Sequence, residues 1–274
     1  MVKRSDVTLS IYEKAMPDSL SWSDRLNCTR ACGYDLLEIS IDESDYRLSR
    51  LDDADMQRKI KEAITKTGVP IHSLCLSAHR KYPLGAREQK VQEKAVLILE
   101  KALAFAQYLG IQRIQLAGYD VYYEESGLDT RENFIHNLRT CVNLAAKAGV
   151  VLGFETMELP FMCTISKALA YVKMINSPYL QIYPDLGNIT NGNKNHEMLL
   201  QDMDHGKGHI IAVHLKETRE GVYRNLQFGE GRVNFKEALQ VFYDQGVRIF
   251  GCEIWDDGSG KYQENMRRTV EAIF

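Results

Sequence analysis

The sequence predicts an α/β fold, a closed (β/α)8 barrel built by a single domain that spans residues 1–274. Three observations favour this fold. Eight short apolar runs of β-strand character alternate with eight stretches of helical period. Five predicted helices end at a glycine, and a predicted strand follows each within a few residues. The length of 274 residues also fits a barrel, which typically needs about 250.

Four strand and helix pairs are expected in the first half of the chain. The predicted strands cover residues 7–14, 35–42, 71–78 and 113–119. The predicted helices that follow them cover residues 22–32, 53–67, 87–109 and 130–148. In the third helix, apolar residues recur three and four positions apart, which is the pattern of a helix with one buried face.

Four more pairs complete the set. The strand runs are VVLGFE (150–155), LQIYPD (180–185), IIAVH (210–214) and IFGCE (249–253). The predicted helices cover residues 166–175, 196–202, 234–245 and 262–273. The polar run TNGNKNH (190–196) is expected to be a loop that could act as a lid.

A glycine lies at the C-terminal end of five of the predicted helices. A glycine after a helix adopts the left-handed conformation without steric cost. The glycines concerned are Gly33, Gly68, Gly110, Gly149 and Gly246. An open doubly wound sheet is the alternative fold, but no G-x-G-x-x-G fingerprint follows the first strand and no P-loop occurs.

Composition limits the function classes. A net charge of -3 and a pI near 6.2 provide no general basic field for nucleic acid or for anionic membranes. The chain has no apolar run of signal-peptide length at its start and no run of about 18 apolar residues, so a cytoplasmic protein is expected. The six cysteines lack C-x-x-C spacing and are expected to be reduced.

Four possible metal ligands lie at or near the ends of the last four predicted strands: Glu155, Asp185, His214 and Glu253. The carboxyl ends of parallel barrel strands meet at one rim, where barrels carry their chemistry. Three carboxylates and a neutral imidazole suit a hard divalent ion such as Mn²⁺, Mg²⁺, Co²⁺ or Zn²⁺. The pattern therefore predicts an enzyme with one divalent metal ion at this rim.

The sequence resembles a known family almost end to end, the sugar isomerases and epimerases with a xylose isomerase-like TIM barrel. Within that family it is most similar to the L-ribulose 5-phosphate 3-epimerases, also called L-xylulose 5-phosphate 3-epimerases. The motifs that carry the resemblance are SIYEKAMP (10–17), LEISIDESDYRLSRL (37–51), CLSAHRKYPLG (75–85), IQLAGYDVYY (114–123), YPDLGN (183–188), AVHLKET (212–218), FGEG (228–231) and EIW (253–255).

The resemblance implies a metal-dependent epimerase that inverts C3 of a ketose phosphate. Glu155, Asp185, His214 and Glu253 would hold the metal, and Glu155 and Glu253 would also form the proton-transfer pair. Inversion requires removal of the C3 proton and its return on the opposite face, so two bases must flank the carbon. Members of this family usually form dimers or higher assemblies, so the resemblance also implies a homodimer or a higher homo-oligomer.

The resemblance also implies substrate contacts. Glu158 is expected to bind a sugar hydroxyl, and Asn188 is expected to approach the sugar; families that act on free ketoses carry histidine at the position of Asn188. The phosphate needs basic groups at the same rim. The candidates are Lys14 after the first strand, His79, Arg80 and Lys81 after the third, and Lys216, Arg219 and Arg224 after the seventh, with His79 and Arg219 as the first choices.

Three other functions fit parts of the pattern. An aldose-ketose isomerase would use the same metal and glutamates but move the proton between C1 and C2. A metal-dependent nuclease would require additional histidine ligands and a basic groove, whereas the charge balance of this chain is acidic. A sugar-phosphate sensor without catalysis would have no need of both glutamates.

Overall fold

Eight parallel strands form one sheet in the computed structural model, which describes all of residues 1–274. Their order is β6-β5-β4-β3-β2-β1-β8-β7. The strands are β1 (Thr8–Tyr12), β2 (Leu36–Ile41), β3 (Ile71–Leu76), β4 (Arg113–Ala117), β5 (Val151–Glu155), β6 (Leu180–Ile182), β7 (Val213–Leu215) and β8 (Ile249–Cys252). Each lies inside or within one residue of a predicted strand.

Backbone hydrogen bonds join β6 and the residues after it to β7 and the residues before it, and so close the sheet on itself. The Ile182 N–H donates to the His209 carbonyl (2.9 Å), and the Ile211 N–H donates to the Ile182 carbonyl (3.0 Å). Further along, the His214 N–H donates to the carbonyl of Pro184 (2.8 Å). The predicted (β/α)8 barrel is therefore confirmed.

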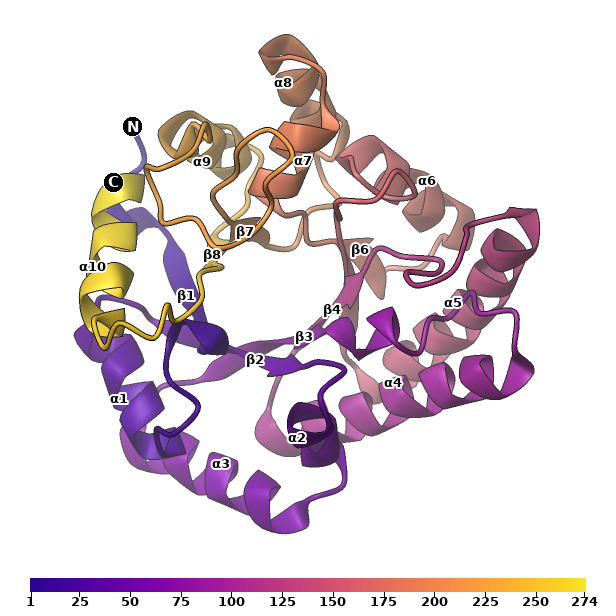
Figure 1. The fold of residues 1–274 in the computed structure, drawn as a ribbon, viewed down its shortest axis with the longest axis horizontal. Helices are drawn as coiled ribbons and strands as arrows, with labels where there is room; N and C mark the ends of the chain where they lie inside the picture. The colour runs from indigo at the N-terminus through magenta and orange to yellow at the C-terminus, as the bar shows by residue number, and fades with distance from the viewer.

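Helices surround the sheet on its outer side (Figure 1). They are α1 (Trp22–Ala31), α3 (Ala54–Thr67), α4 (Gln89–Leu109), α5 (Leu128–Ala148), α6 (Ile165–Ile175), α8 (His196–His205), α9 (Phe235–Asp244) and α10 (Tyr262–Ile273). These correspond to the eight predicted helices. The five glycines predicted to end helices all have a positive φ, between 66° and 97°. None of the helices has the length and apolar character required to cross a membrane.

Several short elements were not predicted. They are α2 (Asp45–Leu48), α7 (Leu186–Gly192) and four 3-10 turns, η1 (Arg4–Asp6), η2 (Glu13–Ala15), η3 (Ser49–Leu51) and η4 (Ser77–Arg80). The prediction of a loop over residues 190–196 holds only for residues 193–195, because residues 190–192 form the end of α7 and α8 begins at His196. Helix α7 begins at Leu186 because the side chain of Asp185, the preceding residue, accepts a hydrogen bond from Asn188 N.

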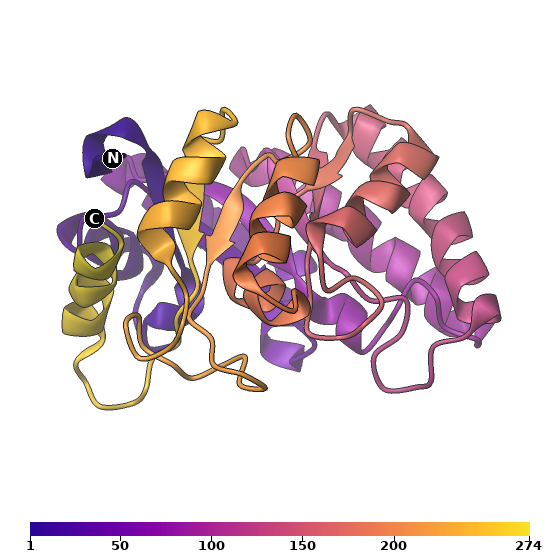
Figure 2. The same cartoon turned by 90° about the horizontal axis from the view of Figure 1, so that it is seen from above.

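Strand β2 shows how the barrel separates apolar from polar side chains. Leu37, Ile39 and Ile41 belong to the apolar core, whereas Glu38 and Ser40 alternate with them and are equally buried. Glu38 binds side chains from β3 and β7, so it points into the barrel interior. Polar side chains such as Glu38 therefore occupy the interior of this barrel. The loops after β7 and β8 lie together on one side of the barrel (Figure 2).

Candidate active site

The four predicted ligands converge at the C-terminal rim of the barrel. Glu155 ends β5, His214 lies in β7, Glu253 directly follows β8, and Asp185 follows β6 and caps α7. One possible ligand atom from each side chain lies within 4.8 Å of the others, and all four residues are buried. We call these four residues the quartet.

The quartet fits a divalent cation. It offers three carboxylates and one imidazole, a donor set typical of Mn²⁺, Mg²⁺, Co²⁺ or Zn²⁺ sites. Asp185 Oδ2 and Glu253 Oε2 are buried and accept no hydrogen bond within the protein, although Glu253 Oε2 lies 3.4 Å from the Lys216 ammonium. Buried carboxylate oxygens without a partner are costly, and a cation would satisfy both of them.

The surroundings set the charge states of the quartet in the absence of a cation. Burial raises the pKa of Glu155, and it raises the pKa of Asp185 to about 7. Burial also disfavours the ionised form of Glu253, but the Lys216 ammonium and the His214 ring together outweigh this effect and lower its pKa. For His214, burial disfavours the charged ring, yet the adjacent Glu38 carboxylate raises its pKa well above the usual value.

Glu38 orients the imidazole of His214 from inside the barrel. Its Oε1 lies 2.5 Å from His214 Nε2, while its Oε2 accepts hydrogen bonds from Ser73 Oγ (2.5 Å) and the Tyr183 hydroxyl (3.0 Å). His214 Nδ1 faces Glu155 Oε1 (3.5 Å). Because the Glu38 carboxylate can only accept a hydrogen bond, His214 Nε2 carries a proton. In a neutral ring the other nitrogen, Nδ1, then has a lone pair, which points toward the quartet.

Gly251 makes room for this arrangement. A Cβ atom at this position would lie 2.9 Å from the Tyr183 hydroxyl oxygen, 3.0 Å from Ser10 Oγ and 3.1 Å from His214 Cδ2. The IFGCE run therefore requires a glycine two residues before the ligand Glu253, because the Tyr183 ring and the imidazole pack against its backbone.

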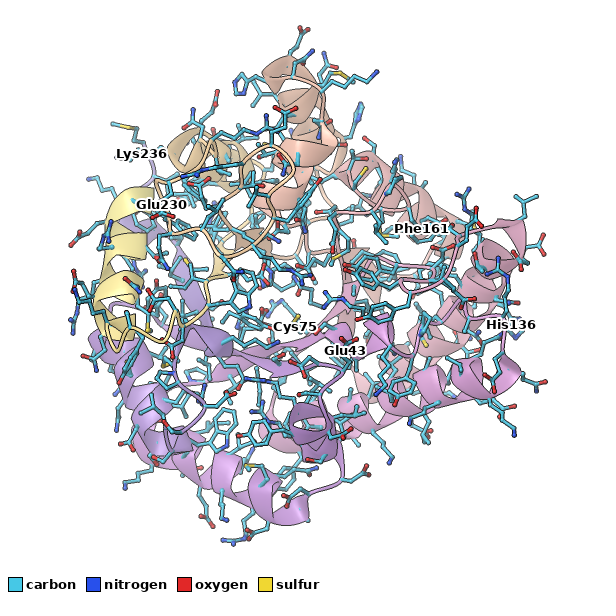
Figure 3. All side chains as sticks on the ribbon, in the orientation of Figure 1. Glu43, Cys75, His136, Phe161, Glu230 and Lys236 are labelled. Atoms are coloured by element: carbon cyan, nitrogen blue, oxygen red, sulfur yellow. The ribbon has the colours of Figure 1, made fainter.

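A pocket reaches the quartet through Glu155 and Glu253, and Tyr12, Met157 and Trp255 also line it. Cys75 also lines it and lies near the centre of the ring of strands (Figure 3). Four basic residues reach this pocket: Lys14, Arg80, Lys216 and Arg224. The pocket thus combines two carboxylates of the quartet with four basic side chains.

Glu158 and Asn188 differ in their access to this pocket. Glu158 lines it; its Oε2 accepts a hydrogen bond from the Tyr119 hydroxyl (2.7 Å), and its Oε1 faces Arg224 (3.5 Å). Asn188 is buried beside the quartet, where its Nδ2 donates to the Thr156 carbonyl (2.7 Å). Its Oδ1 is buried without a partner.

The structure does not place His79 or Arg219 in the pocket. His79 is buried, its Nε2 lies 3.0 Å from the Ala95 carbonyl of α4, and burial lowers its pKa to about 4, so it is neutral at pH 7. Arg219 is exposed, and its Nε donates to the Glu230 carbonyl (2.7 Å). These placements do not support the two first choices for the phosphate contact, whereas the candidates Lys14, Arg80, Lys216 and Arg224 do line the pocket.

A buried carboxylate anchors the loop between β7 and α9, which carries Arg224. Glu217 accepts hydrogen bonds from the backbone N–H groups of Thr218 (2.9 Å), Gly229 (3.0 Å) and Val233 (3.1 Å). The side chain ties the two ends of the FGEG region together. These three hydrogen bonds hold the long loop between β7 and α9 in one conformation at the C-terminal rim of the barrel.

We expect Glu217→Gln to loosen this loop. The amide has one acceptor oxygen instead of two, so at least one N–H loses its partner, at a cost of about 1–3 kcal/mol. Trypsin should then cut faster after Arg224, which can be followed by mass spectrometry. Glu220→Gln, at an exposed glutamate of the same loop, is the control. Equal cleavage rates in the two variants would show that Glu217 does not anchor the loop.

Comparisons with known proteins agree with this architecture. Residues 27–273 match the model of a family described as "Xylose isomerase-like TIM barrel". The L-ribulose-5-phosphate 3-epimerase UlaE of Escherichia coli is 45% identical over 253 residues, which cover 92% of this chain and 88% of that protein. A putative L-ribulose-5-phosphate 3-epimerase UlaE of Shigella dysenteriae shows the same identity and coverage.

Solved structures share the fold at low identity. A D-allulose 3-epimerase from Methylomonas sp. in complex with D-allulose superposes with a TM-score of 0.78 at 16% identity, covering 98% of this chain and 96% of that one. The IOLI protein with a bound zinc atom superposes with a TM-score of 0.75 at 13% identity, covering 97% and 95%.

Proposed function

Because the chain belongs to the L-ribulose-5-phosphate 3-epimerases of the xylose isomerase-like TIM barrel family, we propose that it interconverts L-ribulose 5-phosphate and L-xylulose 5-phosphate in a metal-dependent reaction. One observation carries the proposal. Glu155 and Glu253, the two carboxylates expected to move the proton, come from different strands and lie 3.5 Å and 3.8 Å from the same nitrogen, His214 Nδ1. Two bases are thus available around one small space.

The two glutamates perform the inversion. The C3 proton is acidic because the adjacent C2 carbonyl delocalises the charge left on C3. One glutamate removes this proton, and the other, in its protonated form, delivers a proton to the opposite face of the planar enediolate. For the reverse substrate the two roles exchange. Each positioned acid or base contributes about 10²- to 10⁴-fold to the rate.

The quartet would hold one divalent metal ion, Mn²⁺, Mg²⁺, Co²⁺ or Zn²⁺. When bound, such an ion supplies Lewis-acid polarisation of the C2 carbonyl. The unpartnered oxygens of Asp185 and Glu253 support this assignment, as does the zinc bound by the IOLI protein of the same fold. The protein's own part is to hold the four donors on four strand ends, so that little reorganisation is needed on binding.

Glu158 and Asn188 position the sugar. Glu158 is held by the Tyr119 hydroxyl and faces the pocket, where its carboxylate can accept a hydrogen bond from a substrate hydroxyl. The amide of Asn188 is fixed by Thr156 and leaves a buried oxygen free beside the quartet. That free acceptor can bind a donor on or near the substrate.

Arg80 binds the phosphate. Its guanidinium lies over the ring of Tyr122 (4.9 Å to the ring centroid) and is 5.9 Å from the centroid of Tyr119, it forms no ion pair, and its Nε has no hydrogen-bond partner. An arginine stacked on aromatic rings without a carboxylate partner can give a bidentate contact to phosphate oxygens. Lys14, which is paired with Asp42 (2.6 Å), lines the same part of the pocket and adds positive charge.

We expect Arg80→Met to raise KM for L-ribulose 5-phosphate about 10- to 100-fold, which corresponds to the loss of a hydrogen bond to a charged group. KM for free L-ribulose should change less than about threefold, because that ketose has no phosphate. Steady-state kinetics with both ketoses measure the ratio. Arg219→Met is the matched comparison: if it alone raised KM selectively, the phosphate would lie at the β7 loop, beside one of the two first-choice residues, and not at Arg80.

Proton NMR in D₂O tests the reaction itself. L-ribulose 5-phosphate incubated with metal-loaded protein should gain deuterium at C3 and yield L-xylulose 5-phosphate. Deuterium at C1 together with an aldose product would instead identify an aldose-ketose isomerase. No exchange with any pentulose or hexulose phosphate would contradict both enzymatic functions and favour a sensor.

A further inference from the structure

Lys216 is a buried lysine whose ammonium faces the quartet. Its Nζ lies 3.3 Å from Asp185 Oδ1 and 3.4 Å from Glu253 Oε2, and its side chain is 7% exposed. No other lysine or arginine lies within 4.0 Å of a quartet carboxylate. The residue also lines the pocket, so the ammonium is both buried and open to a bound ligand.

The N–H donors of Lys216 are not committed to the protein. An ammonium carries three donors. Both of its carboxylate contacts are longer than the roughly 2.7–2.9 Å typical of charge-assisted hydrogen bonds. By contrast, Lys14 at the pocket rim lies 2.6 Å from Asp42. The geometry therefore leaves Lys216 free to donate to an oxygen inside the pocket.

The charge of the site is compatible with a cation in this position. When all three carboxylates of the quartet are ionised, they carry one more negative charge than a divalent ion neutralises, and the Lys216 ammonium balances that excess. When one glutamate is protonated as the proton donor, the ammonium leaves a positive charge beside the substrate. When C3 loses its proton, a further negative charge spreads onto the neighbouring oxygens of the substrate, beside the base Glu253 that Lys216 contacts.

We propose that Lys216 is a catalytic residue of the epimerisation and that its ammonium donates a hydrogen bond to the substrate oxygen on which negative charge develops. This inference rests on the proposed function. Lys216 keeps its protons throughout, so no bond to it forms or breaks. A donor fixed in a water-poor pocket stabilises the developing charge more strongly than it stabilises the neutral ketone, and therefore acts mainly on kcat.

Lys216→Met tests the proposal, because it keeps the length of the side chain and removes its charge and donors. We expect kcat for L-ribulose 5-phosphate to fall about 10²- to 10³-fold, the usual loss for one oxyanion donor. KM should change less than about fivefold. Affinity for a hydroxamate analogue of the enediolate should fall in parallel with kcat. Lys207→Met, at an exposed lysine, should behave as wild type.

A Mn²⁺ titration of each variant without substrate separates catalysis from support of the metal site. The proposal requires Mn²⁺ to bind Lys216→Met at least as tightly as wild type, because a positive charge has been removed from the site. It is overturned if excess Mn²⁺ restores kcat, or if kcat stays within threefold of wild type. Should the methionine variant not fold, Lys216→Gln decides by the same criteria. If wild type itself exchanges no deuterium at C3, the proposed function fails, whatever the variants do.

Discussion

Glu155→Gln and Glu253→Gln are each expected to abolish epimerisation, with losses in kcat of at least about 10³-fold. Each substitution removes a base and weakens a metal ligand while nearly preserving the shape of the side chain. The loss of turnover should be measured at saturating Mn²⁺, with metal occupancy determined for each variant. Glu220→Gln, at an exposed glutamate, is the control and should keep full activity.

The two variants should differ in a way that identifies the mechanism. A variant with one remaining base can still remove the C3 proton of the epimer whose hydrogen faces that base, and can return a deuteron to the same face. In D₂O, Glu155→Gln should therefore label one of the two pentulose phosphates at C3 without forming product, and Glu253→Gln should label the other. Labelling of the same epimer by both variants would contradict the two-base mechanism.

The barrel and the positions of the four ligands could be predicted from the sequence because both follow from local patterns. Strand and helix periods fixed the order of elements, and the glycines marked the helix ends. In a parallel barrel, this order alone brings the ends of β5 to β8 to one rim. Glu155, Asp185, His214 and Glu253 could therefore be grouped without knowledge of any contact.

The direction of side chains within a short turn could not be predicted. His79 and Arg80 are adjacent in the basic run that suggested a phosphate site, and both belong to the 3-10 turn η4. The turn directs His79 toward α4 and Arg80 toward the pocket. Charge and sequence position are nearly the same for the two residues, so only the three-dimensional course of the turn distinguishes them.

Contacts between residues far apart in the chain also could not be predicted from the sequence. Glu38 and His214 are 176 residues apart. A single glutamate inside the apolar run DLLEISID was a visible signal, because an ionised group buried in a strand must find a partner. The sequence does not indicate which residue is the partner of Glu38. Helix α7 was missed for a related reason, since Asp185 serves both as a helix cap and as a possible ligand.

Glu38→Gln is expected to lower the affinity for Mn²⁺ about 10- to 100-fold, as is typical when the hydrogen-bond partner of a metal-binding histidine is altered. The carboxylate accepts from three donors, His214 Nε2, Ser73 Oγ and the Tyr183 hydroxyl. An amide has only one acceptor oxygen, and its NH₂ group facing His214 would favour the tautomer with the proton on Nδ1. That proton would occupy the lone pair directed at the quartet.

Isothermal titration with Mn²⁺ and thermal unfolding without metal measure the two consequences of this change separately. The free energy of unfolding should fall by about 1–3 kcal/mol, because buried donors lose their acceptor. Ser73→Ala removes one donor but keeps the contact between Glu38 and His214, so it should retain Mn²⁺ affinity within about threefold. If Glu38→Gln binds Mn²⁺ as tightly as wild type, the imidazole is oriented by another group. Gln115, whose Nε2 lies 3.2 Å from His214 Nδ1, would then be the residue that holds it.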